Sequence, residues 1–328
     1  MKKIKTLLVT FLCSVFVLTV FSCSTTVPVK VKRPAKLDMQ GARTLAVLPF
    51  QPKYVDPTLS QSSMRGIFSS SNSNDKDIRD KEEICSNLTY ALEETLASTE
   101  YYELQNSTRV KVALERGTEI PADAYLYGYI SDYQVTDEIQ NQKQLQSLEE
   151  EIPIYRRHVK GRIVYQVINA STNRVISNDY MTFDSYGDKR DANKNKLEAP
   201  YQIIRSDINS LVLKIGKQIQ PYYETVNLSL LSDKTKNPEM KVADNLASHG
   251  YIEDAQQKFE EIYREDGNFS AGYNSALLLQ ALGRLDEAKT QMQELVSITG
   301  DRKAINALKN IEYEMSQQEK LQAQELFR

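Results

Sequence analysis

The stretch Thr44-Leu45-Ala46-Val47-Leu48-Pro49-Phe50 sets the fold class of the first part of the chain. It is a nearly continuous apolar run that ends at a proline and a phenylalanine, and such a run predicts a strand buried on both faces of a sheet. A helix is predicted next, over about residues 80–98, because its apolar residues recur at one-turn spacing. They are Ile84, Leu88, Leu92 and Leu96. A strand followed by such a helix indicates a sheet with helices packed on it.

Further strands and helices continue this pattern. Residues 124–130 alternate strictly, which places Tyr125, Tyr127 and Tyr129 on one face of a strand. We expect a helix to cover these tyrosines; the alternative is a tyrosine surface that binds a peptide or glycan. Two paired strands, a helix and a last strand are expected at 157–168, 175–183, 199–219 and 225–230. This order predicts an α+β or α/β domain over residues 41–231.

Three segments of this domain are polar and show no apolar period. They are expected to be loops or insertions, the second of them with a helical alternative, and lie at 51–80, 136–151 and 184–198. Cys85 lies beside the apolar stripe of the first helix and has no histidine or second cysteine near it in sequence. We expect it to be a small buried hydrophobic residue.

The composition argues against most kinds of chemistry. The 328 residues include 41 basic and 44 acidic ones, a net charge of -3, so no overall positive field attracts nucleic acid. Three cysteines and two histidines offer little for disulfides, metals or acid–base catalysis. Phosphate-loop, nucleophile-elbow and zinc-protease motifs are absent from the sequence. We therefore expect no catalytic residues, no cofactor, no metal and no nucleic-acid partner.

The N-terminus has the features of a secretory signal. Lys2, Lys3 and Lys5 precede an apolar run over residues 7–21, which is too short to span a bilayer as a stable helix. The run ends in Ser22-Cys23, which resembles the lipobox of bacterial lipoproteins. The resemblance implies that residues 1–22 are removed and that Cys23 is acylated and holds the chain to membrane lipid. An ordinary signal peptide cut nearby, or an uncleaved anchor, is the alternative.

Residues 23–40 are interpreted as a tether. The segment combines prolines with basic residues, which favours an extended strip lying near anionic headgroups. A solvated linker is the alternative. The residues concerned are Pro28, Lys30, Lys32, Arg33, Pro34 and Lys36.

Four short segments resemble a family of outer-membrane lipoproteins that contains the curli secretion channel CsgG and the lipoprotein activators of penicillin-binding proteins. They are AVLPF at 46–50, YYELQ at 101–105, ADAYLYGYI at 122–130 and INASTNRVI at 168–176. Gln105 stands where an acidic residue is common in the family, and Asn173 replaces the usual turn glycine. The resemblance implies a CsgG-like domain and a place in the bacterial envelope. Ser24 after the lipobox cysteine favours the outer membrane, and we expect the chain to face the periplasm.

The last part of the chain is predicted to be a helical repeat. Gly250, Ala255 and Phe259 match Gly283, Ala288 and Met292 at a spacing of 33 residues. This pattern resembles tetratricopeptide repeats, in which glycine makes the turn and alanine lies where the two helices touch. Residues 302–328 are expected to form a long capping helix, so that the repeat domain covers 238–328.

The same resemblance implies which residues face a ligand: Asp244, Tyr273 and Gln280. Ordinary solvated helix surface is the alternative for all three. Two repeats are fewer than a free-standing array needs, so we expect them to pack against the first domain or against a second copy of the chain, as a homo-oligomer.

Three functions remain open. The first is a membrane-anchored adaptor or regulator that binds envelope proteins or peptides in envelope assembly or cell-wall synthesis. The second is a subunit of a CsgG-like secretion channel, which would need apolar membrane hairpins that the polar insertions do not supply. The third is an envelope enzyme that uses dispersed carboxylates.

Overall fold

The structure is a computed structural model that describes residues 25–57, 76–140, 154–190 and 196–326. The chain forms two compact units. The sheet unit contains Pro34–Tyr222 and the chain from Ala323 onward. The helical unit contains the chain up to Arg33 and Tyr223–Gln322. A mixed sheet with helices followed by a run of packed helices confirms the predicted fold class.

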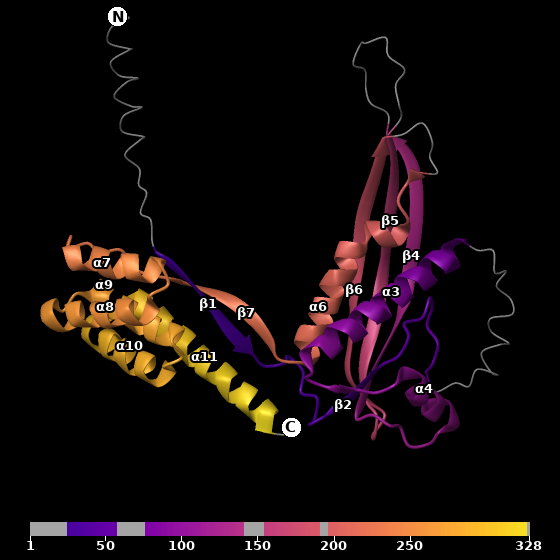
Figure 1. Cartoon of the computed structure of the whole chain (residues 1–328), viewed down its shortest axis with the longest axis horizontal. Helices are drawn as coiled ribbons and strands as arrows, with labels where there is room; N and C mark the ends of the chain where they lie inside the picture. The colour runs from indigo at the N-terminus through magenta and orange to yellow at the C-terminus, as the bar shows by residue number, and fades with distance from the viewer. Residues whose placement is uncertain (1–24, 58–75, 141–153, 191–195, 327–328) are drawn as a thin grey trace, which may run out of the picture. The chain divides into compact units, whose positions relative to one another are not determined.

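In its described residues, the sheet unit has five strands in the order β3-β2-β4-β5-β6. Figure 1 labels four of them, β2, β4, β5 and β6. The short strand β2 runs parallel to both of its neighbours, β3 and β4, whereas β4, β5 and β6 form an antiparallel meander. The strands are β2 (Thr44–Val47), β3 (Glu103–Leu104), β4 (Ala124–Gln140), β5 (Ile154–Asn169) and β6 (Arg174–Arg190).

Helices cover both faces of this sheet. On one face, α3 (Lys76–Thr99) and α6 (Arg205–Ile219) bury their apolar stripes against the sheet in one continuous core. The short helix α5 (Pro200–Ile203) precedes α6. On the other face, Val110 and Leu114 of α4 (Ser107–Arg116) form a second, smaller core. The expected stripe of α3 is confirmed, since Ile84, Leu88, Leu92 and Leu96 are all at most 1% exposed.

The tyrosine stripe of β4 is covered by a helix, as expected, over its first two members. Tyr125 and Tyr127 are buried in the core that contains α4, while Tyr129 is only partly buried. On the opposite face of β4, Gly128 lies against the ring of Phe50 so closely that a Cβ at this position would be 2.1 Å from the Phe50 Cε1 atom.

All three polar insertions were predicted wrongly in part. Residues 136–140 belong to β4 and residues 184–190 belong to β6, so the meander strands are 16 or 17 residues long. Residues 141–153 and 191–195 lie outside the described part of the chain. The first insertion, 51–80, also ends earlier than expected, because α3 begins at Lys76; its residues 58–75 are not described.

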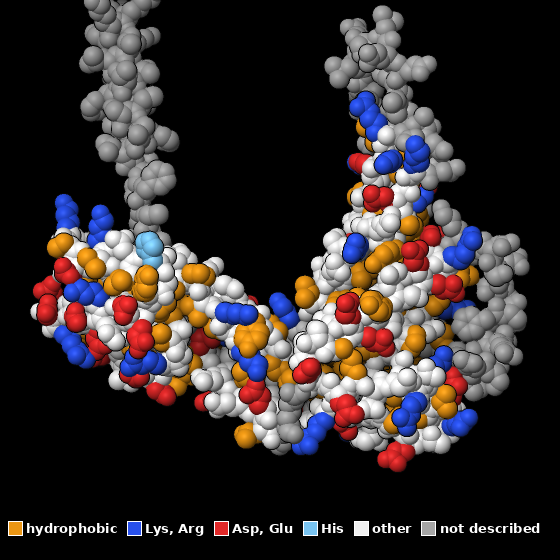
Figure 2. Space-filling view, in the orientation of Figure 1, with side chains coloured by type: hydrophobic (Ala, Val, Ile, Leu, Met, Phe, Trp, Pro, Cys, Tyr) orange, Lys and Arg blue, Asp and Glu red, His pale blue; other side chains and the backbone are white. Residues whose placement is uncertain are grey.

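Cross-strand pairs explain why such polar segments form strands. Arg156 pairs with Asp188 at 2.7 Å, His158 contacts Asp184 at 2.6 Å, and the His158 ring stacks on Tyr186 at 4.2 Å. Figure 2 shows basic and acidic side chains interspersed along these strands. Opposite charges and stacked rings on neighbouring strands stabilise a sheet without apolar alternation, and an apolar period therefore does not detect them.

The helical unit contains five helices and a two-stranded ribbon in its described residues. The helices are α7 (Pro238–Ser248), α8 (Ile252–Asp266), α9 (Phe269–Ala281), α10 (Leu285–Thr299) and α11 (Arg302–Leu326). The repeat positions behave as expected: Ala255 and Ala288 are fully buried, and Gly250 and Gly283 have positive φ angles of 84° and 77°.

The interpretation of residues 23–40 as a tether is wrong over Thr26–Arg33. Thr26–Arg33 form strand β1, which pairs with β7 (Tyr222–Ser229) to make the ribbon. Val27, Leu228 and Leu230 are buried in the same core as the helices. The alternation of valine with polar residues in β1 is a strand signal, but its partner lies almost 200 residues away in the sequence.

Candidate functional site: a groove along the ribbon

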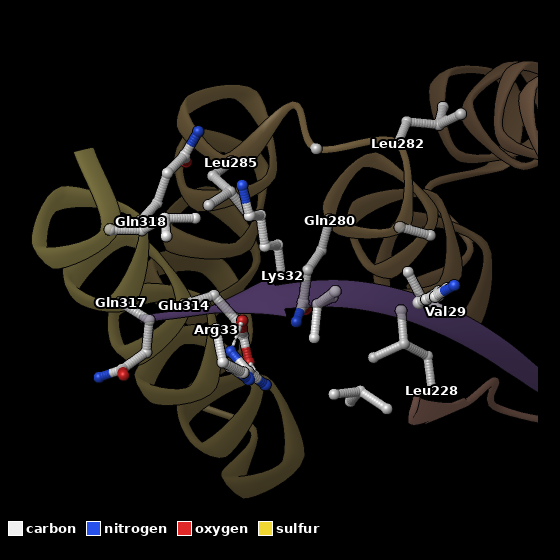
Figure 3. A pocket seen from close by; sticks show the side chains of 16 residues that line it. Val29, Lys32, Arg33, Leu228, Gln280, Leu282, Leu285, Glu314, Gln317 and Gln318 are labelled. Atoms are coloured by element: carbon white, nitrogen blue, oxygen red, sulfur yellow. Dashed lines mark hydrogen bonds and ion pairs between the residues drawn. The ribbon is translucent and has the colours of Figure 1, made fainter. Parts of the chain in front are cut away.

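A groove of about 350 Å³ lies within the helical unit, between β1, the turn that joins α9 to α10, and α11 (Figure 3). We call it the ribbon groove. Its apolar lining includes residues of both strands of the ribbon, of α10 and of α11: Val29, Val31, Val226, Leu228, Leu285 and Leu321. Its polar lining includes Lys30, Lys32, Arg33, Gln280 and Glu314. The volume is in the range of pockets that bind small ligands or a few side chains.

The ribbon packs on α7 and α9, the first helix of each helical pair. Val27 of β1 and Leu228 and Leu230 around β7 share a core with Met240 of α7 and Leu278 of α9. Asn274, which is fully buried on α9, accepts a hydrogen bond from the Leu231 backbone N at 2.7 Å and donates one to the Leu231 carbonyl at 2.9 Å. The chain itself therefore occupies part of the face on which a partner was expected.

Arg33 closes one end of the ribbon groove. Its guanidinium donates from Nη2 to Glu314 Oε1 at 2.9 Å and from Nε to Glu224 Oε2 at 2.9 Å, and a further contact joins Nη1 to Glu314 Oε2. The Arg33 side chain is only 8% exposed and that of Glu314 is 13% exposed. The hydrogen bond with Glu314 raises the pKa of Arg33, burial opposes this shift, and Glu224 adds to it. One buried cation thus joins β1, β7 and α11.

Gln280 brings an unused acceptor to the ribbon groove. Its Oε1 atom is buried and has no hydrogen-bond donor among the described residues. Figure 3 shows the side chain extending from the end of α9 toward β1. A buried amide oxygen without a donor costs free energy, which a ligand N–H would recover.

The other two residues predicted to face a ligand lie elsewhere. Tyr273 is partly buried on α9, with its ring 6.2 Å from that of Phe269, and burial, with Asp301, raises its pKa. Asp244 is partly buried on α7, where burial, with Asp233, raises its pKa. Neither lines the ribbon groove, so the structure brings only Gln280 to it. Cys23 lies outside the described residues.

Sequence reasoning missed Arg33, Glu314 and Asn274. Arg33 stands at the end of an alternating stretch, and that alternation could have placed it on the buried side of a strand with Val27, Val29 and Val31. Glu314 and Asn274 carry no local signal, because their partners are distant in the sequence.

Within the part of the chain that the structure describes, Cys85 and the possible metal ligands form no second site. Cys85 is 3% exposed, and burial raises the pKa of its thiol to about 12, which confirms its expected role as a buried hydrophobic residue. Among the described residues, no group of three or more histidine, cysteine, aspartate or glutamate side chains is placed to hold a metal ion. None of the described helices is both long and apolar enough to cross a membrane.

No family model and no curated protein matches the sequence. Among solved structures, the PelC dodecamer from Paraburkholderia phytofirmans is similar at 11% identity and a TM-score of 0.27, covering 59% of this chain and 98% of that chain. A minor lipoprotein from Acinetobacter baumannii is similar at 12% identity and a TM-score of 0.25, covering 54% and 91%. Lipoprotein GNA1162 from Neisseria meningitidis is similar at 9% identity and a TM-score of 0.23, covering 54% and 96%. The chain thus has a distant structural similarity to PelC and to bacterial lipoproteins, while its place in the CsgG-containing family stays a prediction.

Proposed function

We propose that this chain is a non-enzymatic lipoprotein of the bacterial envelope that binds a protein partner in the ribbon groove. Acylated Cys23 would hold it to the outer membrane on the periplasmic side. The partner would be a component of envelope assembly or cell-wall synthesis.

The observation that carries the proposal is the lining of the ribbon groove. Binding sites combine an apolar floor with a few polar groups that fix orientation. Here the floor is made by valines and leucines, and the polar groups are the buried Arg33–Glu314 pair and the unused acceptor of Gln280. These groups can bind a ligand, but they include no nucleophile paired with a base.

The start of β1 supports a role close to the membrane. Only Ser24 and Thr25 separate Cys23 from Thr26, the first residue of β1. Three residues span at most about 10 Å when fully extended. If Cys23 is acylated, the helical unit is held next to the lipid headgroups, and the ribbon groove is presented to partners at the membrane.

The secretion-channel alternative is less well supported, although the meander strands are long enough to cross a membrane. One face of β5 carries Arg156, Lys160 and Arg162, and the partners of these residues on β4 and β6 are also polar. Lipid-facing strands need apolar residues exposed on one side, and the apolar residues on the other face of β5, such as Val159 and Ile163, are buried in the core with α3 and α6. Self-association of the chain stays a prediction.

Site-specific photo-crosslinking in living cells tests the partner claim. A benzophenone amino acid replaces Gln318, which lines the ribbon groove, or, as a control, Tyr251, which is 60% exposed in the turn before α8. We expect a crosslinked protein partner from position 318 and not from position 251. Crosslinks from 251 alone, or from neither position, would contradict the proposal.

A second arm tests the anchor. Cys23→Ala should abolish labelling with radioactive palmitate and release the chain from the membrane fraction, because none of the described helices can hold it there. Persistence of the variant in salt-washed membranes would contradict the lipid anchor.

A further inference from the structure

The ribbon groove runs along an open edge of a sheet. β1 has β7 on one side, and no other described strand pairs with it. Five consecutive residues of β1, Val29–Arg33, line the groove, whereas β7 contributes only the alternate residues Val226 and Leu228. A cavity lined by five consecutive residues of a strand follows the edge of that strand, and an open edge presents backbone groups that can pair with another strand.

The register of the ribbon shows which backbone groups face this edge. The Leu230 N donates to the Thr25 carbonyl at one end, and Arg33 pairs with Glu224 at the other, so the two strands are antiparallel. In such a pair, alternate residues direct both backbone groups toward the partner strand. The backbone carbonyl of Thr25 is directed toward β7, so the backbone groups of Lys30, five residues later, are directed toward the open edge. Pro28 lies two residues before Lys30, so it stands at another position whose backbone is directed toward the open edge. Proline is tolerated there because no ladder N–H is needed.

The charges around the edge select the kind of strand that could be added. Arg33 in the groove lining is bound to two carboxylates, Glu314 and Glu224. The lining also contains two lysines, Lys30 and Lys32, and the ammonium group of Lys30 lies 4.6 Å from the ring centroid of Tyr223. The side chains of Lys30 and Lys32 are exposed and lie on the face of β1 opposite the buried Val27 and Arg33. An added strand would place alternate residues beside these lysines and the others against Leu285 and Leu321.

We propose that the ribbon groove takes up an extended segment of alternating acidic and apolar residues as a third strand on the open edge of β1. This inference rests on the proposed function and names the chemistry of its partner. Gln280 Oε1 accepts an N–H from the incoming backbone, in the way that Asn274 on the same helix already accepts the Leu231 N–H.

A designed peptide tests this inference with the full chain in detergent. The probe is acetyl-Glu-Val-Glu-Leu-Glu-Val-Gly-amide carrying a fluorophore, and its binding is measured by fluorescence anisotropy. The control peptide has lysine in place of each glutamate. We expect only the acidic peptide to bind, with an affinity that falls as salt is added. Equal binding of both peptides, or binding of neither, would overturn the inference.

Protein and peptide variants separate charge from strand pairing. Lys30→Glu should weaken the acidic peptide about fivefold and allow the lysine peptide to bind. Lys30→Pro should abolish binding while the melting temperature stays within a few degrees, and Lys30→Gln is the matched control for lost charge. A second comparison needs no protein variant. One peptide is methylated on the backbone nitrogens of its odd residues, and another on those of its even residues. Methylation should abolish binding for the set whose N–H groups face β1, and it should not do so for the set that faces away. Equal effects of the two sets would overturn strand pairing.

Failure of this inference can be told apart from failure of the proposed function. A crosslink from position 318 together with no binding of the acidic peptide would overturn the third strand and leave the protein-binding function standing. Loss of both the crosslink and peptide binding would overturn both.

Discussion

Asn274 and Leu231 form a two-way clamp: the amide of Asn274 both accepts from and donates to the backbone of Leu231, at 2.7 Å and 2.9 Å. Asn274 belongs to α9, and Leu231 follows the last strand of the ribbon. The clamp therefore fixes the ribbon on the helices, and with it one wall of the ribbon groove. Asn274 thereby adds to the apolar packing of Val27, Leu228 and Leu230 that also holds the ribbon on the helices.

Replacing Asn274 should loosen the ribbon. Asn274→Leu removes both hydrogen bonds and leaves the Leu231 N–H and C=O without partners, which should lower the free energy of unfolding by about 2–4 kcal/mol. Hydrogen exchange of β7 in urea would measure the loss. Asn245→Leu, on the exposed side of α7, is the matched control and should change stability by less than about 0.5 kcal/mol. Equal effects of the two variants would contradict the clamp.

Arg33 and Glu314 should depend on each other. Arg33→Met leaves the largely buried Glu314 carboxylate without its cation and should cost about 3 kcal/mol. The double variant Arg33→Met with Glu314→Met should recover most of that loss, because both charges are then gone. Thermal unfolding of the four proteins of the cycle gives the coupling. Additive losses would show that the pair does not act as a unit.

The sheet unit should lose stability in acid through Asp179. Burial opposes ionisation of Asp179, but hydrogen bonds from Lys214, Gln218 and Tyr165 outweigh it and lower the pKa to about 2. The pKa of Asp179 in the folded chain is below its unfolded value of about 3.9. The ionised carboxylate therefore adds to the free energy of unfolding above pH 4, and this contribution is lost as the pH falls toward 2. Because the carboxylate is partly exposed, we expect its contribution to the free energy of unfolding to be about 1 kcal/mol.

Asp179→Asn tests this pH dependence. Urea unfolding at pH 5 and at pH 2.5 should show a smaller difference for the variant than for the parent chain. Asp132→Asn is the control, since the side chain of Asp132 is 69% exposed and lies 3.8 Å from Arg162. A pH profile that Asp179→Asn leaves unchanged would rule out this carboxylate as the cause.

The contact between Gly128 and Phe50 should exclude any side chain at position 128. Gly128→Ala places a methyl group where the ring of Phe50 lies, and overpacking of this kind costs about 1–3 kcal/mol. In a Phe50→Ala background the same substitution should cost at least about 1 kcal/mol less. Urea unfolding of the single and double variants measures the coupling. Equal costs in both backgrounds would mean that the ring does not set the limit.

The features predicted best from the sequence are those with a local period. The one-turn spacing of Leu88, Leu92 and Leu96 predicted α3, and the repeated glycines Gly250 and Gly283 predicted the helical pairs. The strand at 44–50 was also predicted from its own composition, although β2 ends at Val47. In each of these cases the residues that form the element carry the signal themselves.

The ribbon groove could not be predicted in the same way. Its walls depend on β1 meeting β7, on Arg33 reaching Glu314, and on Asn274 reaching Leu231. Each of these contacts joins residues that are distant in the sequence, so no local pattern reports them. The prolines and lysines of residues 23–40 favoured a tether because their composition was weighed more heavily than the alternation of valines.

The most direct test of the central claim is crosslinking in the native envelope followed by mass spectrometry. The strain carries Leu285→Arg, which fills the ribbon groove with a charge, and the control is Leu213→Arg on α6, where Leu213 is 60% exposed. We predict that Leu285→Arg removes the crosslinks between the helical unit and its partner while membrane attachment and amount of protein stay unchanged. Leu213→Arg should leave those crosslinks in place. Partner crosslinks that survive Leu285→Arg undiminished would contradict binding in the ribbon groove.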